Sequence, residues 1–324
     1  MSPRTRILLL VAAAAAAAAA VAVGAAVVQS GEEAVPAAAQ RPQGAPPLLL
    51  DLGLRDDPEA RALREAERLW ADGEHERARA VFARYDSDDA RVGAALTSWP
   101  DGSVAALRRL AAEHPERGDV HLNLGFALFW SGRREEAVEA WREARRVDPD
   151  SLAAVRAGDL LFPGFARGLP VFVPSFGPPP ELRGLPEAEQ LERLRAAAEG
   201  GGVRERLLHG VALQRIGRPV SARRAYDAAV EAAPDDVEAL VAAAVARFDK
   251  ERPDVAFSRL GPLAQRFPEE PTVRFHLGLM LLWMGDVDDA RRQLVRARDL
   301  DPADPLAREA ARFLERLESV EGDG

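Results

Sequence analysis

The chain has no cysteine, only two tyrosines and, among its 324 residues, a single lysine, Lys250. Without cysteine it cannot form disulfides, thiolate metal sites, a cysteine nucleophile or a lipid-modified amino-terminal cysteine. Tyrosine and β-branched residues favour strands, so their scarcity argues against a sheet. No glycine-rich loop is followed by lysine, which excludes the common phosphate-binding loop. The apolar content of 47% is enough for a sizeable core.

The sequence also lacks a concentration of positive charge and a set of metal ligands. The net charge is −9, and the arginines are spread along predicted helices, unlike a nucleic-acid-binding surface. The five histidines do not pair with each other or with carboxylates at ligand spacing, so we expect solvated or packing roles for them. These histidines are His75, His114, His121, His209 and His276. We therefore predict a protein that is not an enzyme and binds no metal, cofactor or nucleic acid.

An uncharged run from Ile7 to Val28 follows Arg4 and Arg6 and is 22 residues long. A helix of this length spans roughly 33 Å, enough to cross the hydrocarbon core of a bilayer. Arginines before the run and acidic residues after it place the amino terminus in the cytoplasm. We predict a single-pass membrane protein anchored through residues 7–28, with the carboxyl-terminal domain outside the cytoplasm. The alternative is a cleaved signal peptide, because small residues lie near Ala25, and hence a secreted or periplasmic protein.

Prolines recur at a fixed interval in the carboxyl-terminal half. Pro234, Pro268 and Pro302 follow one another 34 residues apart, and Pro149 ends an earlier stretch of helical periodicity. Proline stops a helix, and 34 residues is the length of a repeating helix–turn–helix unit. The spacing therefore predicts stacked helical hairpins.

The stretch 119–149 shows one such unit in full. Its first predicted helix carries a Leu-Gly pair and a further leucine on one face, and its second carries a large residue between two alanines, followed by proline. In chain order these residues are Leu124, Gly125, Leu128, Ala137, Trp141, Ala144 and Pro149. Gly and Ala allow two helix axes to approach closely, and we expect the large residue to wedge against the neighbouring hairpin.

This order of residues closely resembles the tetratricopeptide repeat. Similar copies end at Pro302, Pro234 and, more weakly, Pro268, while a further copy begins near Glu59 and residues 91–115 form a shortened one. The resemblance implies an all-α helix–turn–helix solenoid that holds a protein or peptide partner in its concave groove.

We predict two repeat blocks separated by a non-helical insertion rich in proline and glycine. The predicted segments are a membrane anchor or signal segment (1–28), a flexible linker (29–56), the first block (57–151), a helix with the insertion and a connecting helix (152–202), the second block of three 34-residue repeats (203–304) and a capping helix (305–320). The insertion, residues 161–186, carries a cluster of Val171, Phe172, Val173 and Phe176, which a disordered linker seldom has. We expect this cluster to pack against the concave face.

Two of the predicted first helices carry a second apolar stripe in addition to the one that forms the hairpin core. A helix that is apolar on two faces is covered on both. We predict that these stripes line a partner-binding groove, and their residues are Leu122, Phe126, Phe129, Trp130, Phe275, Leu279, Leu282 and Trp283. Gln214 and Arg215 interrupt the corresponding stripe of the repeat that starts at Val203. The alternative is that the insertion fills the groove.

The functional prediction is a non-enzymatic scaffold or adaptor that acts outside the cytoplasmic membrane and binds a peptide or helix of a protein partner. Two alternatives are an envelope enzyme or accessory subunit with its site in residues 161–186, and a self-associating structural protein. Convergent polar groups in the insertion would favour the enzyme, whereas a packed strap would argue against it.

Overall fold

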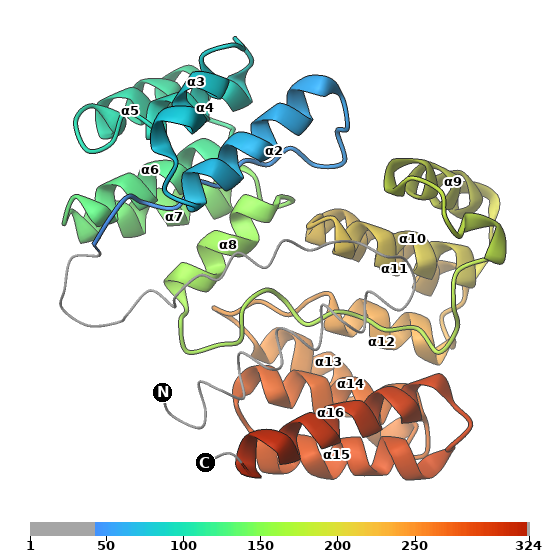
Figure 1. Ribbon diagram of the computed structural model, residues 1–324. Helices are drawn as coiled ribbons and strands as arrows, with labels where there is room; N and C mark the ends of the chain where they lie inside the picture. The colour runs from blue at the N-terminus through green and yellow to red at the C-terminus, as the bar shows by residue number, and fades with distance from the viewer. Residues whose placement is uncertain (1–42, 323–324) are drawn as a thin grey trace. The chain divides into compact units, whose positions relative to one another are not determined.

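The computed structural model describes residues 43–322. Over these residues the protein consists of helices and connecting segments with no strand, which confirms the predicted all-α fold (Figure 1). The chain divides into two compact units. Their described parts are residues 43–163, the amino-terminal unit, and residues 164–322, the carboxyl-terminal unit.

The amino-terminal unit contains three helical hairpins followed by one more helix that packs on the third hairpin. Side chains of Asp57, Ser87 and Ser151 cap helix starts by accepting backbone N–H bonds three residues on. The helices are α2 (Pro58–Ala71), α3 (His75–Phe82), α4 (Asp88–Leu96), α5 (Ser103–Glu113), α6 (Gly118–Trp130), α7 (Arg134–Val147) and α8 (Leu152–Leu161).

The carboxyl-terminal unit begins with a non-helical segment, continues through a short 3-10 helix, one α-helix and three hairpins, and ends with a helix that packs on the last hairpin. Its helices are η1, a 3-10 helix (Pro180–Leu182), α9 (Glu187–Gly200), α10 (Val203–Arg215), α11 (Pro219–Ala232), α12 (Val237–Val245), α13 (Asp254–Arg266), α14 (Pro271–Met284), α15 (Val287–Leu300) and α16 (Pro305–Gly322).

The four prolines stand where the spacing predicted helix ends. Helices α7, α11, α13 and α15 each end two residues before Pro149, Pro234, Pro268 and Pro302, respectively. The fixed period of the sequence is therefore the period of the hairpins.

The helices of a hairpin approach closely because a glycine faces a large side chain. A Cβ atom on Gly125 would lie 2.2 Å from Trp141, and one on Gly210 would lie 2.2 Å from Tyr226, so only glycine fits at either position. The ring of Trp141 contacts Phe126 and Phe129 of the first helix of its own hairpin.

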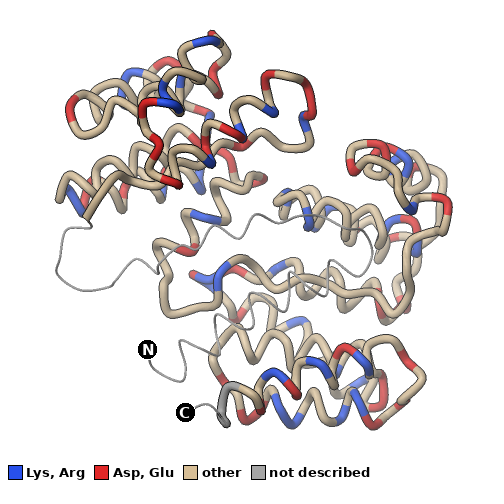
Figure 2. The backbone as a smooth tube through the Cα atoms, in the orientation of Figure 1, with Lys and Arg blue, Asp and Glu red and all other residues tan. Residues whose placement is uncertain are grey.

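Residues 165–178, which we call the strap, follow an extended path past α12 and belong to no helix (Figure 1). Charged residues are spread along the helices of both units, whereas the strap carries only one, Arg167 near its start (Figure 2).

No helix within residues 43–322 is long and apolar enough to cross a membrane. This finding contradicts the predicted localisation as a single-pass membrane protein. Even the 18-residue helix α16 carries Arg308, Glu309 and Arg312. The predicted anchor, residues 7–28, lies outside the described residues. That prediction depended on length and absence of charge, although the tract from Ala12 to Ala20 is only weakly apolar.

Candidate functional site

We call the first helix of each hairpin its inner helix. Side chains of two of them, α10 and α14, bind the main chain in the middle of the strap. The amide of Gln214 on α10 forms two hydrogen bonds with Phe172: it accepts from the backbone N–H (3.2 Å) and donates to the carbonyl (3.3 Å). On α14, Nε2 of His276 accepts the N–H of Val173 at 2.9 Å. These bonds hold the two consecutive peptide groups between Val171 and Val173. Because they contact the main chain, they do not depend on the side chains of these residues.

Further polar side chains bind the strap on either side of this point. Glu238 on α12 accepts the N–H of Ser175 at 2.8 Å. Lys250, the single lysine of the sequence, is buried and donates from Nζ to the carbonyl of Ala166 at 2.7 Å. The main chain of the strap is therefore held along its length by side chains from α10, α12, α14 and the connection between α12 and α13.

The side chains of the strap supply apolar anchors. Phe172 is only 1% exposed; its ring stacks on His276 (centroids 5.1 Å apart, 18° between planes) and meets Tyr226 edge-on at 5.6 Å. Phe176 lies under the guanidinium of Arg204, 4.5 Å from its ring centroid. Full burial of such a ring contributes about 1.5–3 kcal/mol. The strap is therefore part of the hydrophobic core of this unit.

The hydrogen bonds of His276 fix its protonation state. Because Nε2 accepts a hydrogen bond from the N–H of Val173, Nδ1 carries the ring hydrogen and donates a hydrogen bond to the carbonyl of Thr272 at 2.7 Å. The ring is completely buried, and this burial lowers its pKa to about 4. Only the neutral ring has an unprotonated Nε2 that can accept the hydrogen bond from the N–H of Val173.

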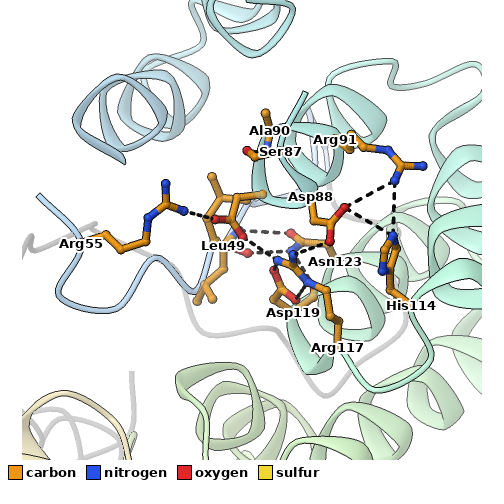
Figure 3. Close-up of polar contacts among 12 residues, drawn as sticks. Leu49, Arg55, Ser87, Asp88, Ala90, Arg91, His114, Arg117, Asp119 and Asn123 are labelled. Carbon is orange, nitrogen blue, oxygen red and sulfur yellow. Dashed lines mark hydrogen bonds and ion pairs between the residues drawn. The ribbon is translucent and has the colours of Figure 1, made fainter. Parts of the chain in front are cut away.

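A second non-helical segment is bound in the same way in the amino-terminal unit. Residues 46–52, which we call the leading segment, include Leu49, whose N–H and C=O both bond to the side-chain amide of Asn123 on α6 (3.1 and 2.7 Å, Figure 3). Glu67 on α2 accepts the N–H of Leu50 at 3.1 Å. In both units, therefore, a side-chain amide and a carboxylate on different helices bind the main chain of a non-helical segment.

Apolar side chains also anchor the leading segment. Leu48, Leu50 and Leu52 are buried in the core of the amino-terminal unit. The indole N–H of Trp70 donates to the carbonyl of Pro46 at 2.7 Å.

Two of the binding side chains occupy equivalent positions in different repeats. Asn123 and His276 each stand two residues before the glycine of their hairpin, Gly125 and Gly278. The same position on an inner helix therefore binds a main-chain group in both units.

The predicted groove residues lie on these same inner helices, and most of them are buried. Two members, Phe129 and Trp130, remain partly exposed. The six that are at most 1% exposed are Leu122, Phe126, Phe275, Leu279, Leu282 and Trp283. Trp130 and Trp283 thus differ in accessibility although they occupy matching positions in the sequence.

Sequence reasoning missed the polar residues that bind the segments. In the sequence pattern Gln214 only interrupts an apolar stripe, and His276 carries the expectation of a solvated or packing role. The usable signal is a single amide or imidazole on a helix that is otherwise apolar on two faces, because a buried polar side chain needs a hydrogen-bond partner.

A separate cluster of charges in the amino-terminal unit joins the starts of α4 and α6 (Figure 3). Arg117 forms ion pairs of 2.6 Å with both Asp89 and Asp119, and Arg55 pairs with Asp89 at 2.7 Å. Burial opposes the charge of Arg117, but its bonds to the two aspartates prevail and raise its pKa. This network connects successive hairpins and explains why acidic residues gather at these helix starts.

Residues 43–319 contain no cluster of side chains suited to a metal ion. A mainly apolar cavity of about 250 Å³ lies beside the strap in the carboxyl-terminal unit, lined also by α9, α10 and the start of α16. The strap therefore leaves unfilled space between itself and these helices.

Two family models, both described as tetratricopeptide repeat, match the chain: one over residues 100–158 and the other over residues 207–260 and 242–305. No curated protein matches significantly.

Similar solved structures share low identity with the chain. Yeast Tom70 is 14% identical over 83% of this chain and 56% of its own, so the chain spans little more than half of Tom70 (TM-score 0.32). YrrB, described as a TPR protein with an unusual peptide-binding site, is 18% identical over 64% of this chain and 99% of its own (TM-score 0.31). The TPR2AB domain of yeast Sti1, in a complex with pHSP90, is 13% identical over 80% and 98% (TM-score 0.29).

Proposed function

The chain belongs to the tetratricopeptide repeat family, a fold of protein–protein interaction scaffolds, and we propose that it binds an extended peptide of a protein partner on the inner helices of its repeats. The single observation that supports this function is the way the chain already binds itself. Side-chain amides in both units form paired hydrogen bonds to the backbone of a non-helical segment. Inner helices that bind one extended main chain have the chemistry to bind another.

The eight predicted groove residues have two roles in this proposal. The six buried ones shape the inner face, and the partly exposed pair at the end of α6, Phe129 and Trp130, contacts the partner directly. Their rings lie 5.7 Å apart, and Arg134 lies 5.7 Å above Phe129. Aromatic anchors of this kind dominate binding energy in interfaces.

The alternative of an active site in residues 161–186 required convergent polar side chains. The polar side chains that reach the strap form hydrogen bonds with its main chain, and they belong to Gln214, His276, Glu238 and Lys250. Their use in holding the strap favours a binding role over a catalytic one.

Selection from a displayed peptide library on the immobilised full chain tests the proposal. A selected peptide should bind Trp130→Ala roughly 30-fold more weakly than the wild type, because an aromatic anchor contributes about 2 kcal/mol. Trp99→Ala is the matched control: it removes another partly buried tryptophan of the same unit, from outside α6.

Affinity measured by fluorescence anisotropy, with circular dichroism as a check on folding, separates the outcomes. The proposal fails if no peptide is enriched above an unrelated helical control protein. It also fails if selected peptides bind Trp130→Ala as tightly as they bind the wild type.

A further inference from the structure

The strap is bound in the manner of a ligand rather than of an ordinary connection between helices. Its peptide groups bond to side chains from three different inner helices, which supply Gln214, Glu238 and His276. An extended segment with unpaired N–H and C=O groups requires such partners when it is buried.

The side chains of the strap define a compact pattern. Between Leu169 and Pro178 the strap has no charged residue, and it reads aromatic, aliphatic, proline, small, aromatic from Phe172 to Phe176. The first aromatic ring is buried between an imidazole and a phenol, and the second lies under the guanidinium of Arg204. The proline at Pro174 keeps this stretch extended and leaves no N–H to satisfy.

The surroundings of the strap give another chain access to the same site. The cavity of about 250 Å³ runs along the strap from Val171 to Pro178, and its lining is mainly apolar. Residues on both sides of the strap, Gly164 and Gly184, are exposed. A competing segment therefore has an apolar surface next to the strap on which to begin binding.

We propose that the strap is a built-in occupant of a peptide site, and that the external ligand of this site is an extended, uncharged segment of a partner protein with the same pattern: aromatic, aliphatic, proline, small, aromatic. This inference rests on the proposed function and names the ligand class for the carboxyl-terminal unit. A tethered occupant competes at an effective concentration of about millimolar, so the intact chain binds such a ligand only weakly until the strap is released.

The test uses a fluorescent peptide with the sequence of residues 169–178 and the full chain with residues 171–176 replaced by a glycine–serine stretch of equal length. This variant should bind the peptide at least about 10-fold more tightly than the intact chain does. Adding Gln214→Ala should weaken binding about 10-fold, a change of about 1.4 kcal/mol, because both bonds to the peptide residue that corresponds to Phe172 are lost.

Two matched controls accompany the test. Gln265→Ala removes an exposed amide on α13 and should leave binding unchanged. A peptide with the first aromatic residue replaced by alanine should bind at least about 10-fold more weakly. The inference is overturned if the folded variant does not bind the peptide, or if it binds equally well with Gln214→Ala.

If the replaced variant does not fold, a milder change decides the question. Phe172→Ala in the otherwise intact chain weakens the occupant and should increase affinity for the added peptide about 10-fold, whereas Phe267→Ala, in the same unit but outside the strap, should not. Equal binding of the peptide by Phe172→Ala and the wild type overturns the inference. Failure here leaves the proposed function intact, because that test depends on Trp130 in the other unit.

Discussion

The burial of His276 predicts that the carboxyl-terminal unit loses stability in acid. In the folded protein burial lowers the pKa of this histidine to about 4, compared with an ordinary value of 6.5. Between these values the unfolded chain binds a proton that the folded chain does not, so stability rises with pH. The neutral ring makes its full contribution to the stability of the folded protein above pH 6.5, and this contribution is lost as the pH falls to about 4.

The size of the effect follows from the two pKa values. At about 1.36 kcal/mol for each pH unit between them, the loss amounts to about 3 kcal/mol. The effect of Glu238 on stability has the opposite sign. Burial raises the pKa of this carboxyl group, so the folded state binds more protons than the unfolded state does. The contribution of Glu238 to stability therefore weakens as the pH rises above 4.5. A comparison of two proteins that both contain Glu238 cancels this effect.

His276→Asn is the appropriate comparison, because asparagine fills the equivalent position at Asn123 and there binds the main chain without titrating. Hydrogen exchange of amides in α14, corrected for intrinsic rates, would report the stability of this unit between about pH 7 and pH 4. We expect the wild type to lose about 3 kcal/mol more than His276→Asn. Equal losses in the two proteins would refute the assignment of a buried neutral histidine that binds the strap.

Two further predictions concern the amino-terminal unit. Gly125→Ala should destabilise the protein by about 1–3 kcal/mol in chemical denaturation, because the new methyl group meets the ring of Trp141 at 2.2 Å. Gly158→Ala, where the nearest atom is 3.9 Å away, should be neutral or stabilising, and an equal loss in both variants would contradict the packing argument. Asn123→Ala should release the leading segment and accelerate its cleavage by protease; unchanged cleavage would show that the amide does not hold it.

Regular features of the fold could be predicted from the sequence because they are local. A glycine or alanine at the crossing, a large residue facing it and a proline after the second helix are all set within one repeat. The spacing of Pro234, Pro268 and Pro302 is therefore enough to locate the ends of α11, α13 and α15.

The binding positions could be predicted only in part because they depend on contacts between distant residues. His276 meets Val173 across 103 positions, and Asn123 meets Leu49 across 74. Trp130 and Trp283 look alike in sequence, yet the first is partly exposed and the second is fully buried. The apolar cluster of the insertion nevertheless indicated that it packs, since exposure of those side chains would be unfavourable.

In the carboxyl-terminal unit, side chains of α10, α12 and α14 bind the main chain of the strap. Hydrogen exchange of the backbone amides of Phe172, Val173 and Ser175 in the full chain measures this binding. We expect these amides to exchange as slowly as those of α14, and to exchange faster in Gln214→Ala. Exchange in the wild type as fast as at the exposed connection around Gly184 would contradict the account.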